Sequence, residues 1–143
     1  MKRISVLVLL GAALSFAACN SNQTKEDETV LNDSLPRTTI EFDNPKFDFG
    51  TITQGEVVEH TYFFTNTGTA DYKIETVQAS CGCTTPNYTE TAVKPGEKGN
   101  IVVKFNSAGR SGNQSKTVTV YGNSEEGKIQ LSFTAKITVP ENK

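Results

Sequence analysis

Lys128-Ile129-Gln130-Leu131-Ser132-Phe133-Thr134-Ala135-Lys136-Ile137 is the stretch that decides the fold of this chain. Apolar side chains occupy every second position, and polar or charged ones stand between them. A period of two predicts a β-strand with one face in the core and one in water. Such strands are typical of antiparallel sheets that have a solvated side.

Other stretches toward the N-terminus show the same alternation. They are Phe47-Asp48-Phe49 and residues 58–65, 72–77, 101–105 and 118–120, and Val58, His60, Tyr62 and Phe64 share one face. Asn66-Thr67-Gly68 and Pro95-Gly96-Glu97 are typical turn sequences, because Pro pre-sets φ and Gly accepts a positive φ. The glycine-rich residues 107–112 are expected to form a hairpin or a crossover connection.

These strands predict an all-β fold, an immunoglobulin-like antiparallel β-sandwich of about seven strands over residues 42–139. Residues 140–143 would form a short tail. We find no convincing amphipathic helix. The chain has no Trp, which excludes the Cys–Trp–Cys core of antibody domains, and we expect apolar packing alone to hold the sheets together.

Composition excludes several classes of function. The net charge is -2, so no basic field for nucleic acid exists. The chain has a single His and neither an HExxH nor a nucleophile-elbow motif, which argues against a conventional hydrolase. We therefore predict a non-enzymatic protein without a cofactor.

Ser80-Cys81-Gly82-Cys83-Thr84-Thr85 is the one chemically unusual segment of the predicted domain. In an extended strand the two cysteine Cα atoms would lie about 6.6–6.8 Å apart, whereas disulfides prefer about 5.5–6 Å. A bend at Gly82 would instead allow a small, easily reduced ring. The extended form would be a two-thiol clamp for Cu(I) or Zn.

The roles of Cys81 and Cys83 stay open at this point. They form a structural disulfide or pack as small buried residues, exchange disulfides, hold a soft metal, or pair between molecules. Two sulfurs fill only half of a zinc site. His60 is a weak candidate for a further ligand, and a dyad of His60 with either cysteine lacks a local signature. We expect His60 to be a core residue, because it is in register with Val58, Tyr62 and Phe64.

The domain resembles a bacterial family of unknown function, domain-of-unknown-function family fifteen-seventy-three. The resemblance rests on Phe47-Asp48-Phe49-Gly50, on the pattern from Val58 to Gly68, on Ser80-Cys81-Gly82-Cys83-Thr84, on Pro95-Gly96-Glu97, and on Gly112 followed by Lys116-Thr117-Val118. It implies a PapD-like or major-sperm-protein-like immunoglobulin fold, often found in lipoproteins. It carries no activity to this chain.

The N-terminus has the pattern of a bacterial lipoprotein. Lys2 and Arg3 precede a short apolar run, and the small residues Ala17 and Ala18 precede Cys19. This pattern predicts a signal peptide over residues 1–18 and a lipidated Cys19 as the first mature residue. Several acyl chains, such as palmitate, would anchor it stably, where one chain binds only marginally.

Residues 19–41 are predicted to be the lipidated cysteine and a polar tether, because they offer too little apolar surface to fold. Lys25-Glu26-Asp27-Glu28 resembles surface-export tags, but a solvated charge run is the favoured interpretation. Asp33-Ser34-Leu35 resembles an O-glycosylation acceptor at Ser34. We expect an envelope lipoprotein on the outer membrane, facing the periplasm or the cell surface.

Two functions follow from these expectations. The first is a membrane-tethered module that binds an envelope protein by strand addition to a sheet edge, as PapD-like folds often do. The alternative is a thiol-active protein that uses Cys81 and Cys83 for disulfide exchange or for binding Cu or Zn.

Overall fold

The computed structural model describes residues 35–141, in which all regular structure is β-strand. The predicted signal peptide, Cys19, the charge run at residues 25–28 and Ser34 lie outside the described residues. The strands are β1 (Ile40–Phe42), β2 (Lys46–Thr53), β3 (Val57–Asn66), β4 (Ile74–Ala79), β5 (Thr84–Tyr88), β6 (Lys98–Asn106), β7 (Gly112–Gly122) and β8 (Lys128–Thr138).

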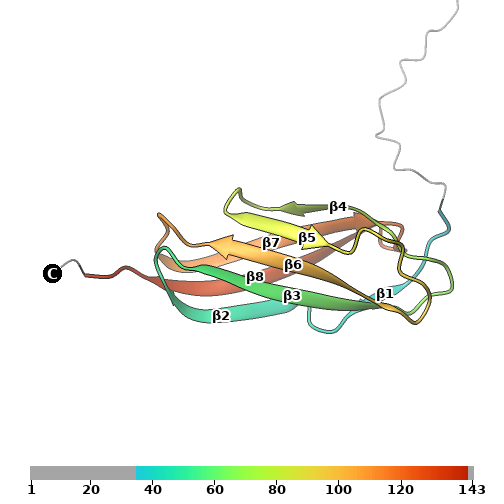
Figure 1. Cartoon of the computed structure of the whole chain (residues 1–143), viewed down its shortest axis with the longest axis horizontal. Coiled ribbons are helices and arrows are strands. Elements are labelled where there is room, and N and C mark those ends of the chain that lie inside the picture. The colour runs from blue at the N-terminus through green and yellow to red at the C-terminus, as the bar shows by residue number, and fades with distance from the viewer. Residues whose placement is uncertain (1–34, 142–143) are drawn as a thin grey trace, which may run out of the picture. The chain divides into compact units, whose positions relative to one another are not determined.

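Two four-stranded sheets stack face to face, in the order β1-β3-β6-β5 for sheet one and β2-β8-β7-β4 for sheet two (Figure 1). This arrangement confirms the predicted all-β sandwich. Within residues 35–141, no helix is long and apolar enough to cross a membrane. The loop at residues 107–112 is a crossover, because β6 and β7 belong to different sheets.

The strand count and one pairing differ from the prediction. The structure has eight strands rather than about seven, and β2 runs parallel to β8, whereas all other pairs are antiparallel. The parallel pair has a simple cause. The first strand of the sandwich is split, leaves sheet one after Phe42 and joins sheet two at Lys46 without reversing direction.

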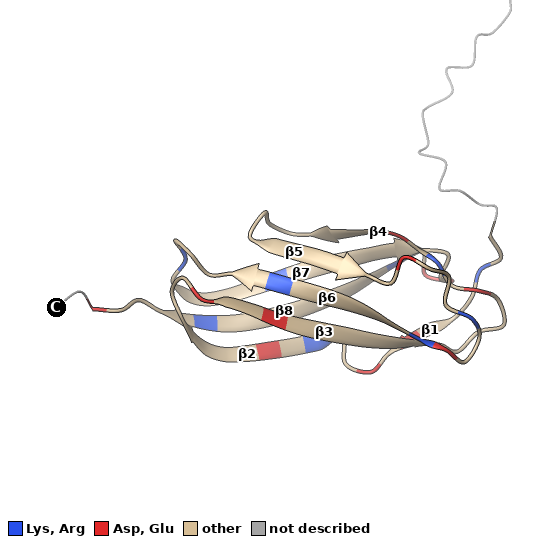
Figure 2. Ribbon diagram, viewed as in Figure 1, with Lys and Arg blue, Asp and Glu red and all other residues tan. Residues whose placement is uncertain are grey.

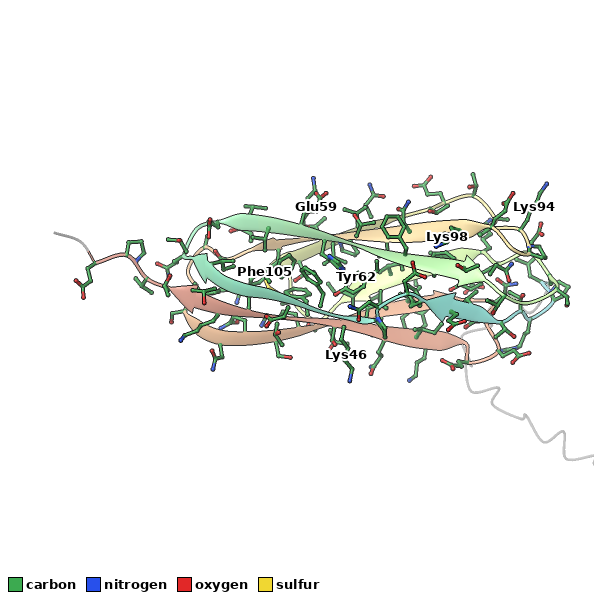
Figure 3. All side chains as sticks on the ribbon, turned by 90° about the horizontal axis from the view of Figure 1, so that it is seen from below. Lys46, Glu59, Tyr62, Lys94, Lys98 and Phe105 are labelled. Atoms are coloured by element: carbon green, nitrogen blue, oxygen red, sulfur yellow. A yellow bond between two sulfur atoms is a disulfide. The ribbon has the colours of Figure 1, made fainter. Side chains whose placement is uncertain are left out.

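The core lies between the sheets and consists of the predicted inward faces. Its fully buried large side chains are Tyr62, Phe64, Tyr72, Ile101, Val103, Phe105, Val118, Val120, Leu131 and Phe133. Figure 3 shows Tyr62 and Phe105 pointing into this layer and Glu59 pointing away from it. The Tyr62 hydroxyl donates to the carbonyl of Ser132 across the layer, 2.9 Å away, and burial raises the pKa of Tyr62 to about 12.

Asn66 begins the predicted turn, since its Oδ1 accepts from Gly68 N–H at 3.1 Å, but it also ends β3 and is fully buried. One local prediction needs correction. The predicted strand at 72–77 begins later, at Ile74. Tyr72 instead forms an isolated bridge with Val93 and is buried.

The sandwich also begins earlier than predicted, because part of the expected tether packs on it. β1 starts at Ile40, before the predicted domain boundary at residue 42. The Thr38 side chain is buried, and its hydroxyl donates to Asn66 Oδ1 at 2.9 Å. The Asn123 side chain donates to the carbonyl of Pro36 at 2.7 Å. Two buried amides therefore hold residues 36–38 at the end of the sandwich where the chain enters.

Candidate functional site

The Cys81-Gly82-Cys83 segment is a tight turn that carries the chain from β4 in sheet two to β5 in sheet one. Cys81 and Cys83 form a disulfide with their Cα atoms 5.3 Å apart. This distance is shorter than an extended strand would give, so the segment bends and does not form the two-thiol clamp. Gly82 at the tip is exposed.

Both sulfur atoms lie against the hydroxyl of Thr84. Thr84 Oγ1 is 3.4 Å from Cys81 Sγ and 3.8 Å from Cys83 Sγ. Thr84 is only 5% exposed, whereas both cysteines are partly exposed, and Cys83 packs against the hydrophobic core. The disulfide thus has one side toward solvent and one side toward a buried hydroxyl.

His60 does not lie with the cysteines, because β6 separates its strand from β5. Its ring stacks on Phe47, with ring centroids 3.5 Å apart, and meets Tyr62 edge-on at 4.6 Å. Burial among these rings lowers the pKa of His60 below its ordinary value of 6.5. The structure therefore places His60 as a half-buried member of an aromatic cluster.

The residues around Cys81 and Cys83 provide few ligands for a metal ion. Between Leu35 and Glu141, no three His, Cys, Asp or Glu side chains gather where they could hold a metal. Both sulfurs are already joined to each other. Lys, Arg, Asp and Glu are scattered over both sheets rather than gathered on one face (Figure 2).

The sheet edges are the second feature that could support a function, because an open edge can accept a strand. On β5, Asn106 N–H donates to Cys83 and Thr89 N–H donates to Asn100, so the odd-numbered residues bond to β6. The even-numbered residues therefore face outward. Their donors are unavailable. Thr84 N–H bonds to the carbonyl of Cys81, Pro86 has no N–H, and Tyr88 N–H bonds to Asn87 Oδ1 at 2.8 Å.

Side chains also occupy much of the β2 edge. Lys46 N–H bonds to Asn44, Gly50 N–H to Asp48, and Thr53 N–H to Glu56. β1 is only three residues long, and short edge strands are poor templates. On β4, the Tyr88 hydroxyl approaches the carbonyl of Glu75 at 3.4 Å, but the outward backbone groups of Val77 and Ala79 have no hydrogen bond in the described residues.

The N-terminal half of β3 is different. Asn66 N–H donates to Glu97, and Glu56 C=O accepts from Ser107, so even-numbered residues of β3 bond to β6. The groups of Val57, Glu59 and Thr61 therefore face outward. β1 pairs with Phe64, Thr65 and Asn66, and Asp43 N–H donates to the carbonyl of Phe63 at 3.0 Å, so in the described residues β3 has no partner on that side from Val57 to Thr61. We call the outward groups of Val57, Glu59 and Thr61 the open edge of β3.

Apolar surface accompanies this edge. Four large hydrophobic side chains in residues 35–141 are exposed, and two of them, Val57 at 62% and Phe63 at 49%, lie on β3 at either end of the open edge. Phe47 and Phe49, both partly exposed, pack beside His60 below it. An extended segment placed here would gain backbone hydrogen bonds and apolar contacts together.

Sequence reasoning missed the residues that define these sites. Thr84 carries no signal in the sequence, because only the turn brings its hydroxyl under both sulfurs. Val57 and Phe63 are ordinary strand residues by pattern. Pro86 alone carried a signal, and only for β5: a proline within a strand is typical of an edge strand.

The comparisons with known proteins agree with the fold. A protein of unknown function from Porphyromonas gingivalis W83 superposes with a TM-score of 0.63 at 14% identity, covering 76% of this chain and 51% of that chain. The present chain thus spans about half of that protein. The ASH / PapD-like domain 7 of human CEP192 gives 0.60 at 14% identity, covering 92% of this chain and 100% of the domain.

Similar folds also occur inside enzymes. The secreted serine protease VesC from Vibrio cholerae superposes with a TM-score of 0.55 at 15% identity, covering 70% of this chain but only 23% of the protease. At these identities the likeness extends to the fold alone. No curated protein is significantly similar to the chain. A family model described as "Protein of unknown function (DUF1573)" matches residues 40–137.

Proposed function

The chain belongs to the DUF1573 family of proteins of unknown function, and we propose that it is a membrane-tethered binding module. Cys19 carries the lipid, residues 20–34 form the spacer, and the sandwich binds an extended segment of an envelope protein along the open edge of β3. The observation that carries this proposal is the set of outward backbone groups at Val57, Glu59 and Thr61 beside exposed Val57 and Phe63.

The contrast with β5 and β2, together with exposed Val57 and Phe63, supports docking on β3. An added strand needs N–H donors and C=O acceptors in a row. β5 has its outward donors bonded or missing, and β2 has three of its N–H groups bonded by side chains. The open edge of β3 retains three residues in register. The partner segment would therefore be extended, with apolar residues to lie beside Val57 and Phe63.

A photo-crosslinker tests the docking edge in the full-length chain. A photoreactive residue at Val57 should crosslink an envelope protein in cells, whereas the same residue at Thr85, on β5, should not. Glu59→Pro removes one outward donor without breaking a bond to β6, and it should reduce the Val57 crosslink at least several-fold. Glu59→Gln keeps the N–H and should retain it. Equal crosslinking from both edges, or an unchanged yield with Glu59→Pro, would refute strand addition here.

The tether is tested separately. Cys19→Ala should move the protein from the membrane fraction to the soluble fraction, because the acyl chains would be lost. The same fractionation with Cys81→Ala is the control and should leave the protein with the membrane. An unchanged partition of Cys19→Ala would contradict the anchor.

One observation favours a second candidate, disulfide exchange. The Cys81–Cys83 bond joins residues only two positions apart, and both residues are partly exposed. A loop this short removes little freedom from the unfolded chain, so its contribution to stability falls at the low end of the roughly 0–5 kcal/mol range. The bond can therefore open at little cost to the fold. Mild reductant should add two thiol labels to the folded protein, and an unreactive bond would count against this candidate.

A further inference from the structure

Thr84 is the one hydroxyl placed against both sulfurs of the disulfide. Its Oγ1 is 3.4 Å from Cys81 Sγ and 3.8 Å from Cys83 Sγ, and the side chain is buried. In residues 35–141 its proton has no oxygen acceptor, since the hydrogen bonds of Thr84 Oγ1 are those to the sulfurs. We propose that Thr84 is a positioning residue that stabilises the reduced form of a Cys81–Cys83 exchange site, an inference that rests on the second candidate function.

The physical basis is the difference between two acceptors. A sulfur in a disulfide accepts a hydrogen bond weakly, whereas a thiolate carries a full negative charge and accepts strongly. The Thr84 hydroxyl therefore gains interaction energy when the S–S bond is reduced. A donor that favours the thiolate lowers the thiol pKa. It also makes the disulfide a better oxidant, because the reduced state is the stabilised one.

The surrounding backbone remains fixed when the bond opens. Ser80 N–H bonds to Thr117 O at 2.9 Å on one side of the turn, and Asn106 N–H bonds to Cys83 O at 3.0 Å on the other. Neither bond involves a sulfur atom. Thr84 therefore stays beneath the sulfurs in the reduced protein, where its hydroxyl acts.

The exchange has a defined order. Cys83 packs against the core, so the thiolate of a partner dithiol attacks Cys81 Sγ from the solvent side. The S–S bond breaks, Cys83 leaves as a thiolate within reach of Thr84, and a mixed disulfide joins Cys81 to the partner. The partner's second thiol loses its proton to water. The resulting thiolate attacks the partner's first sulfur in the mixed disulfide, which releases Cys81 as a thiolate. Two electrons pass to the protein, the partner leaves as a disulfide, and the protein thiolates take up protons from water.

Substitutions at Thr84 separate this role from a packing role. The full mature chain is equilibrated with mixtures of reduced and oxidised dithiothreitol, and the dithiol fraction is measured by thiol labelling and mass. Thr84→Val is nearly isosteric and removes the hydroxyl, so it should shift the equilibrium about tenfold toward the disulfide and raise the thiol pKa by about one unit. Thr84→Ser restores the donor and should return both values toward wild type.

Thr85→Val is the matched control, because Thr85 is the exposed neighbour on β5 and should leave both values unchanged. Circular dichroism checks that each variant is folded. If Thr84→Val behaves as wild type while the wild-type bond exchanges, the role of Thr84 is refuted and disulfide exchange stands. If the wild-type bond does not exchange with dithiothreitol in the folded protein, both are refuted.

Discussion

At the scale of single residues, close packing between strands leaves no room for a larger side chain at some positions. Gly99 in β6 lies opposite Phe64 in β3, and a Cβ added there would be 2.3 Å from the Phe64 ring. Gly99→Ala should therefore lower the free energy of unfolding by about 1–3 kcal/mol. Gly82→Ala is the control, since a Cβ there meets nothing within 4 Å. Urea denaturation checks both, and equal effects would contradict this account.

His60 makes stability depend on pH. Burial lowers its pKa in the folded state below 6.5, so the unfolded chain binds the proton more readily. The free energy of unfolding should fall as the pH drops from about 7.5 through 6.5 toward the folded pKa. Urea midpoints at pH 7.5 and 5.5 measure the change, above the range where most carboxylates titrate. His60→Gln should flatten the dependence in this window, and an equal slope in the variant would refute the assignment.

Residue patterns predicted the core but not the polar anchors. Alternation placed Tyr62, Phe64 and Leu131 inside correctly, because burial follows the strand period. Asn66 looked like a turn residue, because asparagine favours turns. Its burial depends on partners distant in the sequence: Thr38 donates to its carbonyl oxygen, and its amide donates to the carbonyl of Val93. Hydrogen bonds between residues so distant in the sequence leave no local signal in it.

At the scale of elements, the long alternating strands were predictable and the short edge strands β1 and β5 were not. β8 was the clearest prediction and lies at the centre of sheet two. β5 was missed, because Thr84-Thr85-Pro86-Asn87-Tyr88 carries a proline and little apolar periodicity. The parallel pairing of β2 with β8 was also missed, since alternation is the same for either direction of a neighbour.

Pro86 gives the edge of β5 a testable role. It occupies the outward-facing position between Thr84 and Tyr88, whose N–H groups are already bonded, so its missing N–H removes the remaining outward donor of this edge. Pro86→Val should restore that donor and increase self-association at high protein concentration, with the monomer fold unchanged. Analytical ultracentrifugation across a concentration series measures the effect. Thr85→Val is the control, because its N–H side faces β6, and association in both variants alike would point to surface hydrophobicity instead.

At the scale of the whole sandwich, the chain enters at the β1 end, and the C-terminal segment leaves at the other end (Figure 1). The turn with Cys81 and Cys83 and the Val57 end of the open edge lie away from the entry point. In a tethered protein this geometry would present both candidate sites away from the anchored end.

The hydrogen bonds that hold residues 36–38 on the sandwich should have a measurable effect on stability. A chain starting at Leu35 keeps the bonds from Thr38 to Asn66 and from Asn123 to Pro36, whereas a chain starting at Ile40 loses them. Asn66 Oδ1 would still accept from Gly68 N–H, and the Asn123 amide would still donate to Asp71. Each lost hydrogen bond contributes about 0.5–1.5 kcal/mol, so the shorter chain should be less stable by about 1–3 kcal/mol in urea denaturation.

A chain starting at Leu35 with Thr38→Val isolates one of these bonds, because it removes the donor to Asn66 but keeps the backbone contacts of the segment. It should be intermediate in stability between the two truncations. If the chain that starts at Ile40 is as stable as the one that starts at Leu35, the hydrogen bonds of residues 36–38 to Asn66 and Asn123 add nothing to the stability of the sandwich.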